Sequence, residues 1–286
     1  MSDGVRSPTV VRRALGQRLR ELRLARDQTV AEVAGAVDIG QSTLTKIELA
    51  QMVPARGKVE KLLSFYGIDG EERDLLLAML RDGNRKEWWE GLKLPPKLGI
   101  YLGLESVATT LKAHDTHLVQ GLLQTADYAR AVIRAARPDL LPHEVDQRVV
   151  SRTRRQEVLT RVDPPPLVLW SVMDEAVLRR QIGGRETMYA QLERLIQVSA
   201  LPNVNLLVMP DSLGAHPGLS GPLSILEFGT GERPVIYVEG QAGNLYQERD
   251  DDLRRCAQTM THILAAAPGT EQSLALITQI AKEMQP

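Results

Sequence analysis

Apolar positions in the first eighty residues recur at spacings of three and four, which predicts a series of short amphipathic helices. The first expected helix covers residues 10–26. The second begins after Thr29, and Glu32 follows three residues later, which is the spacing of a capping box. Three more helices are expected from the segments QSTLTKIELA, GKVEKLLSFYGI and EERDLLLAML. Five helices joined by short turns predict an all-α N-terminal domain over residues 8–82.

From residue 87 the pattern changes, and expected helices alternate with short apolar strands. This change predicts a second, α+β domain over residues 87–284, with a small β-sheet between helices. Helices are expected at residues 104–115, 125–136, 142–161, 185–201, 248–266 and 270–284. Strands are expected at residues 167–172, in NVNLLVMP, in GPLSILEF and in RPVIYVEG.

The second and third expected helices are separated by the segment DIG, the arrangement of a helix-turn-helix. The second helix of this motif enters the major groove of DNA by its N-terminal residues. Gln41 could pair with adenine through two hydrogen bonds, and Lys46 could reach a phosphate or a guanine. We predict that Gln41, Ser42, Thr43 and Thr45 read bases. A plain five-helix bundle without a DNA-binding role is the alternative.

Residues 11–67 resemble the phage-repressor-like (XRE-type) helix-turn-helix family. The segment from Gln41 to Glu48, QSTLTKIE, carries most of the resemblance. The resemblance implies a transcriptional regulator that binds double-stranded DNA. A single module of this kind contacts few bases, so we expect it to bind as a homodimer. Three residues depart from the family pattern: Val30 replaces a polar Gln, Asp38 replaces a turn Gly, and Gly40 replaces a Ser at the start of the third helix.

Charge is distributed unevenly along the chain. Residues 1–67 contain 11 Lys and Arg against 7 Asp and Glu, a net charge of +4, whereas the remainder has a net charge of −5. A basic end on an acidic body favours an anionic partner for that end, although a solvated helix face would have the same composition. The arginines of the first helix, Arg18 among them, are therefore candidate phosphate ligands. Thr29 completes the predicted DNA-binding set.

The C-terminal part resembles a large domain of unknown function that follows helix-turn-helix modules in many actinobacterial regulators. The motifs that carry this resemblance include GLLQTADYARAV, DEAVLRR, LPNVNLLVMP and GAHPGLSGPLSILEF. The resemblance implies an antitoxin-like regulator, often encoded beside a small partner protein. We therefore predict that a protein partner or ligand modulates DNA binding through this domain. An antitoxin-like module that neutralises a small partner protein is the alternative function.

His216 and Ser220 lie in the glycine-rich stretch GAHPGLSGPLSILEF, which raises the question of a hydrolase nucleophile. A nucleophile elbow needs Gly-x-Ser-x-Gly on a strand-to-helix turn, but here the second glycine is misplaced and a strand is expected to follow. A loop at the lip of a binding pocket is the better interpretation, so both residues are candidates for ligand or partner contact. No catalytic constellation is found, and we do not expect an enzyme.

We expect neither a metal nor a cofactor. His114 and His117 are three residues apart, but no neighbouring His or Cys completes a zinc set in the sequence. Cys256 is the single cysteine, so no intramolecular disulfide can form. No apolar run is long enough to span a membrane, and the N-terminus does not resemble a signal peptide. A cytoplasmic, nucleoid-associated protein is expected.

Overall fold

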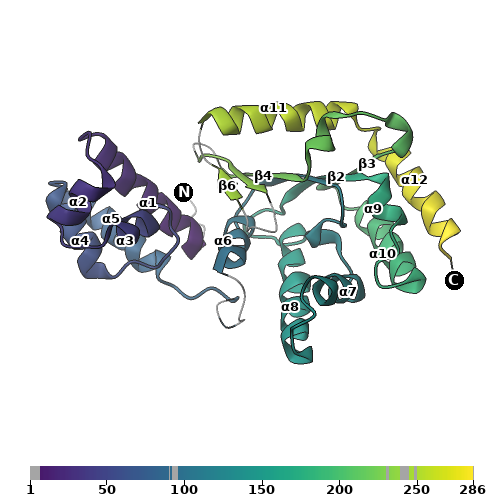
Figure 1. The fold of residues 1–286 in the computed structure, drawn as a ribbon, viewed down its shortest axis with the longest axis horizontal. Coiled ribbons are helices and arrows are strands. Elements are labelled where there is room, and N and C mark those ends of the chain that lie inside the picture. Colours follow the sequence, from purple (N-terminus) through teal and green to yellow (C-terminus); the bar gives the residue numbers. More distant parts are fainter. Residues whose placement is uncertain are drawn as a thin grey trace. The chain divides into compact units, whose positions relative to one another are not determined.

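The computed structural model describes residues 7–89, 91, 96–229, 232–238, 245–247 and 250–285. The chain divides into two compact units, Met1–Val107 and Ala108–Pro286 (Figure 1). The predicted fold class is confirmed, because a helical N-terminal unit precedes an α+β unit with one sheet. Among the described residues, no helix has both the length and the apolar character needed to cross a membrane.

The described part of the N-terminal unit contains six helices, of which the first five were expected. Leu15 and Leu19 of the first helix and Leu44 and Ile47 of the third are buried in one core, as their spacing predicts. The helices are α1 (Pro8–Leu24), α2 (Val30–Ala36), α3 (Gln41–Glu48), α4 (Arg56–Phe65), α5 (Gly70–Gly83) and α6 (Pro96–Glu105).

The boundary between the units follows α6, later in the chain than the predicted boundary between residues 82 and 87. The reason is that the segment after α5 returns to α1. Glu87 Oε1 accepts a hydrogen bond of 2.7 Å from Ser7 Oγ. Gly103 of α6 lies so close to Thr9 that an added Cβ would be 2.2 Å from the Thr9 hydroxyl oxygen. These contacts make α6 part of the N-terminal unit.

A six-stranded sheet in the order β3-β2-β1-β4-β5-β6 forms the centre of the C-terminal unit. The first three strands are parallel to one another, and β4 to β6 continue the sheet as antiparallel neighbours. Their bounds are β1 (Thr110–Asp115), β2 (Val168–Asp174), β3 (Val204–Met209), β4 (Leu223–Glu227), β5 (Val235–Val238) and β6 (Leu245–Gln247).

Helices cover both faces of this sheet. The crossovers between the parallel strands lie on one face, and α11 runs along the other (Figure 1). The last helix lies beside the edge strand β3, where the Ser273 hydroxyl accepts a hydrogen bond from the Val208 amide. The helices of this unit are α7 (Ala126–Ala136), α8 (Pro142–Arg154), α9 (Glu175–Arg179), α10 (Arg185–Val198), α11 (Asp250–Ala266) and α12 (Thr270–Glu283).

The predicted helix over residues 104–115 is wrong, because its second half is the strand β1. This strand lies between β2 and β4, so its backbone groups pair on both sides. Pairing within the sheet overrides local helix preference here. The expected helix 142–161 is also shorter than predicted: α8 ends at Arg154, and a 3-10 turn (Arg155–Leu159) continues it. Neither α9 nor β6 was anticipated.

Candidate nucleic-acid interface and a buried histidine–aspartate cluster

The start of α2 is fixed by the capping box that the sequence predicts. Thr29 Oγ1 accepts a hydrogen bond from the Glu32 amide, and the Thr29 amide donates to Glu32 Oε2 at 2.7 Å. Hydrogen bonds from the amide and hydroxyl of Thr29 lower the pKa of Glu32. Thr29 is exposed, but its hydroxyl is engaged within this box. The predicted DNA-contact residue therefore has a structural role at the helix start.

The turn from α2 to α3 contains two of the residues that depart from the family pattern, Asp38 and Gly40. Asp38 adopts a positive φ of 55°, a conformation that Asp tolerates better than most residues. Gly40 is the N-cap of α3 and supplies no side chain there. The turn geometry is therefore preserved although the usual glycine is absent at Asp38.

Helix α3 separates a polar outer face from an apolar inner face. Leu44 and Ile47 are buried in the core of the unit. Four of the predicted contact residues are exposed, and Thr43 is half-buried; the exposed ones are Gln41, Ser42, Thr45 and Lys46. An amide, two hydroxyls and an ammonium group thus lie together on one short, solvent-facing surface, and these are groups that recognise base edges and phosphates.

A buried ion pair attaches the last turn of α3 to α1. Arg23 Nε donates to Glu48 Oε1 at 2.7 Å, and Arg23 Nη2 donates to Glu48 Oε2 at 2.8 Å. The hydrogen bonds to Glu48 raise the pKa of Arg23. Gly16 of α1 lies against the α3 backbone, where an added Cβ would be 2.5 Å from the Ile47 carbonyl oxygen. Both contacts hold the inner face of α3 in one position.

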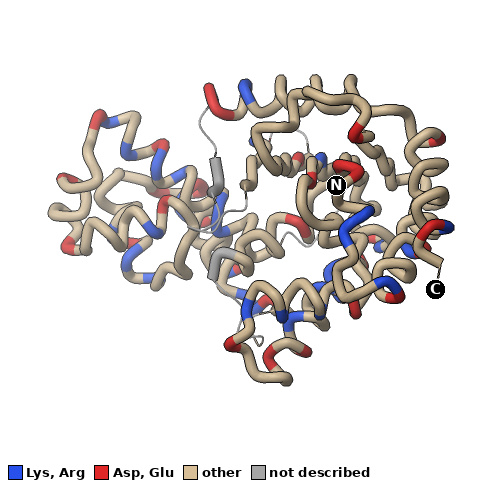
Figure 2. The backbone as a smooth tube through the Cα atoms, turned by 45° about the vertical axis from the view of Figure 1, so that its right-hand side comes forward, with Lys and Arg blue, Asp and Glu red and all other residues tan. Residues whose placement is uncertain are grey.

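The arginines of α1 do not form the uniformly exposed basic face that the sequence suggests. Arg23 is buried with Glu48, so it is not available as one of the candidate phosphate ligands of the first helix. Arg18, a predicted phosphate ligand, donates to Glu72 Oε1 of α5 at 2.9 Å. Figure 2 shows basic positions interspersed with acidic ones in the N-terminal unit. Lys46 is therefore the exposed cation that lies on α3 itself.

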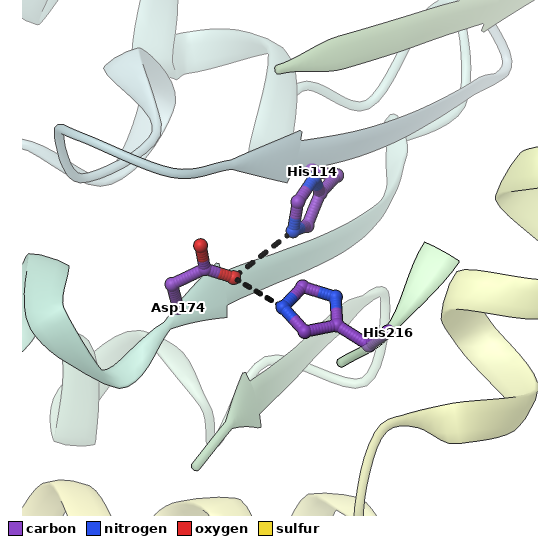
Figure 3. A group of neighbouring side chains, drawn as sticks. All are labelled: His114, Asp174 and His216. Carbon is purple, nitrogen blue, oxygen red and sulfur yellow. Dashed lines mark hydrogen bonds and ion pairs between the residues drawn. The ribbon is translucent and has the colours of Figure 1, made fainter. Parts of the chain in front are cut away.

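Three titratable side chains from distant parts of the chain meet in the C-terminal unit, and we call them the His–Asp–His cluster: His114, Asp174 and His216 (Figure 3). Asp174 Oδ1 lies 3.1 Å from His114 Nε2 and 3.8 Å from His216 Nε2. The His114 side chain is fully buried, and those of His216 and Asp174 are 8% and 19% exposed.

His216 and Ser220, which the sequence predicted as one binding loop, lie in different surroundings. The His216 ring faces the interior toward Asp174, whereas Ser220 is exposed. Ser220 ends a 3-10 turn (Pro217–Ser220) that leads into strand β4, which is not the strand-to-helix setting of a nucleophile elbow. Among the described residues, no hydrogen bond joins the two side chains.

Comparison with known families divides the chain in a similar way to its fold. Residues 14–76 match a family described as a helix-turn-helix domain. Residues 98–279, well over half of the chain, match a domain of unknown function, DUF5753. The chain belongs to the DUF5753 family. No curated protein and no solved structure gives a significant match.

The two matches contain the two candidate sites. The helix-turn-helix match includes the whole of α2 and α3, so it indicates a DNA-binding regulator. The DUF5753 match includes all three residues of the His–Asp–His cluster, and it begins within α6. His114 and His216 are each conspicuous in the sequence, in separate segments, whereas Asp174 is not. Asp174 ends the segment LWSVMD, two residues after the end of the strand predicted at residues 167–172, and an acidic residue just after a buried strand was the available signal.

Proposed function

We propose that the chain is a sequence-specific transcriptional regulator that binds operator DNA as a homodimer, with α3 in the major groove. The observation that carries the proposal is the exposed set Gln41, Ser42, Thr45 and Lys46 on a helix whose opposite face is fixed by the core. Side chains on a rigid helix read bases with little loss of conformational freedom. Thr43, which is also proposed to read bases, is half-buried on the same helix.

The homodimer follows from the small size of this surface. One helix of eight residues contacts few base pairs, so tight binding needs two half-sites about 34–36 Å apart along the DNA. Lys46 supplies a phosphate contact, and Arg18 can add a second if DNA competes with Glu72 for its guanidinium group. We expect selection from a random DNA pool to return a pseudo-palindromic site.

A pair of substitutions tests whether Gln41 reads bases and Lys46 contacts a phosphate. Gln41→Ala should reduce the discrimination between selected and random DNA by about 1–3 kcal/mol and leave non-specific binding unchanged. Lys46→Ala should weaken binding to both DNAs and reduce the slope of log K against log salt by about one. Fluorescence anisotropy over a salt series measures both quantities.

Lys282→Ala is the matched control, because it removes an exposed lysine from α12 in the other unit. It should bind both DNAs as the wild type does. If Gln41→Ala and Lys46→Ala behave alike, the assignment of base and phosphate contacts is wrong. If the wild type retains no DNA at low ionic strength, the proposed function itself is wrong.

The C-terminal unit is proposed to be the regulatory part, which responds to a small protein partner or ligand. Its own six-stranded sheet and separate compactness support this, because such a unit can bind a partner without using the DNA-contact residues. Co-expression with the products of neighbouring reading frames, followed by measurement of operator affinity, tests it. An operator affinity that no co-expressed product changes would argue against a protein partner.

The proposed role is regulatory and not catalytic. Exposed Ser220 precedes a strand, and its neighbour His216 is oriented toward Asp174. We therefore propose no catalytic role for Ser220 and keep it as a candidate ligand or partner contact. Ser220→Ala should then leave DNA binding itself unchanged and weaken its regulation. An unchanged response would remove Ser220 from the proposed contact.

A further inference from the structure

We propose that the His–Asp–His cluster binds a divalent transition-metal ion, with Zn²⁺ as the favoured class. Two imidazoles and one carboxylate are a donor set that zinc accepts in three-ligand sites. One ligand atom from each residue lies within 4.8 Å of the other two. Donors bound tetrahedrally at about 2.1 Å are about 3.4 Å apart, and the separations of 3.1 and 3.8 Å bracket that value.

The sheet brings His114 and Asp174 together at the carboxyl ends of two adjacent parallel strands. His114 is next to last in β1, and Asp174 is the last residue of the parallel strand β2. His114 pairs in register with Val172, and the Val172 side chain packs against Ile263 of α11. Because side chains two residues apart in a strand share a face, His114, Val172 and Asp174 all point to the α11 face of the sheet. Ligands of open α/β sheets bind at the carboxyl ends of parallel strands, which is where this cluster lies.

The backbone around His114 matches the outer shell of a metal-bound histidine. His114 Nδ1 lies 3.4 Å from the Gly221 carbonyl oxygen, an acceptor that favours a proton on Nδ1 and leaves Nε2 directed to Asp174. Gly218 packs on the same ring, and an added Cβ would be 2.4 Å from His114 Cε1. The imidazole is therefore held in one orientation from two sides.

Asp174 is directed to the histidines although its position offers another use. It is the N-cap residue of α9, a place where Asp commonly accepts a hydrogen bond from the helix backbone. Within the described structure its side chain makes no such capping bond, and its Oδ1 faces both rings instead. The carboxylate thus supplies negative charge at the centre of the cluster.

His216 must change its hydrogen bonding when the ion binds. Its Nδ1 accepts a hydrogen bond of 3.2 Å from the Gly218 amide, so the neutral ring carries its proton on Nε2. Coordination through Nε2 places that proton on Nδ1 by exchange with solvent, and the Gly218 amide then needs another acceptor. Ion binding is therefore coupled to a rearrangement of the 3-10 turn (Pro217–Ser220), which packs on α11.

Three protein ligands leave a fourth position for water or for a donor atom of a bound molecule. The partial exposure of Asp174 gives this position a route to solvent. The cluster would then be a point at which an ion, alone or with a small ligand, affects the regulatory unit. The site itself does not depend on the proposed DNA-binding function, because it lies wholly within the C-terminal unit.

Calorimetric titration of Zn²⁺ into the chelator-treated, full-length protein tests the proposal. We expect about one Zn²⁺ bound per chain and, with Co²⁺ in its place, the intense visible bands of a four-coordinate site. His216→Ala and Asp174→Asn should each weaken binding by roughly tenfold or more. Amide hydrogen exchange at residues 218–220 should change when Zn²⁺ is added to the wild type, and it should change less in His216→Ala and Asp174→Asn at the same Zn²⁺ concentration.

His143→Ala is the matched control, because it removes an exposed histidine from α8 and should bind Zn²⁺ as the wild type does. Circular dichroism establishes that each variant is folded, and Asp174→Asn keeps the side-chain volume. Absence of Zn²⁺ binding to the wild type would overturn the proposal. Equal binding by wild type, His216→Ala and Asp174→Asn would also overturn it and would assign the bound ion to other surface groups. DNA retention by the same samples separates this result from a failure of the proposed function.

Discussion

The recognition surface of α3 and the His–Asp–His cluster are both held by tight packing, but they are assembled in opposite ways. The contact residues of α3 are neighbours in sequence, are exposed, and gain their precision from buried residues behind them. The members of the cluster are buried or nearly so and come from three segments, with His114 and Asp174 60 residues apart. A site of the first kind can be found from local periodicity, whereas the second requires the register of a sheet.

Removing Glu48 should have the largest effect, because it breaks the attachment of α3 to α1. Glu48→Ala leaves the Arg23 guanidinium group buried without its carboxylate. The loss of one partner of a buried ion pair costs about 3–5 kcal/mol. We expect the free energy of unfolding, measured by urea denaturation, to fall by that amount.

The double variant Arg23→Met with Glu48→Leu is the control for this prediction. It removes both charges together, so it should recover most of the lost stability. Equal stability of Glu48→Ala and the wild type would show that the ion pair does not hold α3 in place.

Gly16→Ala should disturb α3 without changing any charge. The new Cβ would lie 2.5 and 2.7 Å from the carbonyl oxygens of Ile47 and Glu48, and backbone atoms cannot turn aside as a side chain can. Overpacking of this kind costs about 1–3 kcal/mol, and we expect the upper part of that range. Thermal unfolding measures the loss, and operator affinity should fall with it.

Gly35→Ala provides the contrast, since nothing lies within 4 Å of its added Cβ in α2. It should stabilise the N-terminal unit by up to about 1 kcal/mol through helix propensity. Two Gly→Ala changes in one unit with effects of opposite sign would support close approach of α1 and α3. Stabilisation by both would contradict it.

The equivalent change at the cluster is Gly218→Ala, for which we expect a smaller loss of about 1–2 kcal/mol. Its Cβ would meet a ring, His114 Cε1 at 2.4 Å, and the adjacent 3-10 turn can move by a few tenths of an ångström. Unfolding monitored by tryptophan fluorescence in a Trp88→Phe, Trp89→Phe background, in which Trp170 of β2 is the remaining tryptophan, measures the effect in this unit. Unchanged stability together with unchanged Zn²⁺ affinity would show that the His114 ring is not confined.

These contrasts explain what could be predicted from the sequence. The helical spacing of Leu15, Leu44 and Ile47 predicts that they are buried, as they are. Thr29 and Glu32 form the expected capping box because they are three residues apart in the sequence. The burial of Arg23 could not be predicted, since its partner Glu48 is 25 residues away. The strand β1 was missed because its pairing with β2 and β4 is set by segments far along the chain. The cluster was missed for the same reason.

The smallest effects are expected from two buried tyrosines, one in each unit. Tyr128 Oη accepts a hydrogen bond of 3.1 Å from the Val119 amide, whereas the Tyr66 hydroxyl has no hydrogen-bond partner among the described residues. Tyr128→Phe should therefore cost about 1 kcal/mol, because the amide loses its acceptor. Tyr66→Phe should be neutral or stabilising by a few tenths of a kcal/mol at neutral pH.

At alkaline pH the stability of the wild type should differ from that of Tyr66→Phe. Burial raises the pKa of Tyr66 from 10.0 to about 12, with the nearby Glu48 carboxylate adding to the effect. The folded state therefore holds this proton at pH values where the unfolded chain has released it. The contribution of the raised Tyr66 pKa to stability is complete below about pH 10 and is lost as the pH rises to about 12. By pH 11 the wild type should have lost about 1 kcal/mol more than Tyr66→Phe in urea denaturation. Parallel pH profiles for the two proteins would mean that water reaches the Tyr66 hydroxyl, so that the core behind α3 is less tightly closed than its packing indicates.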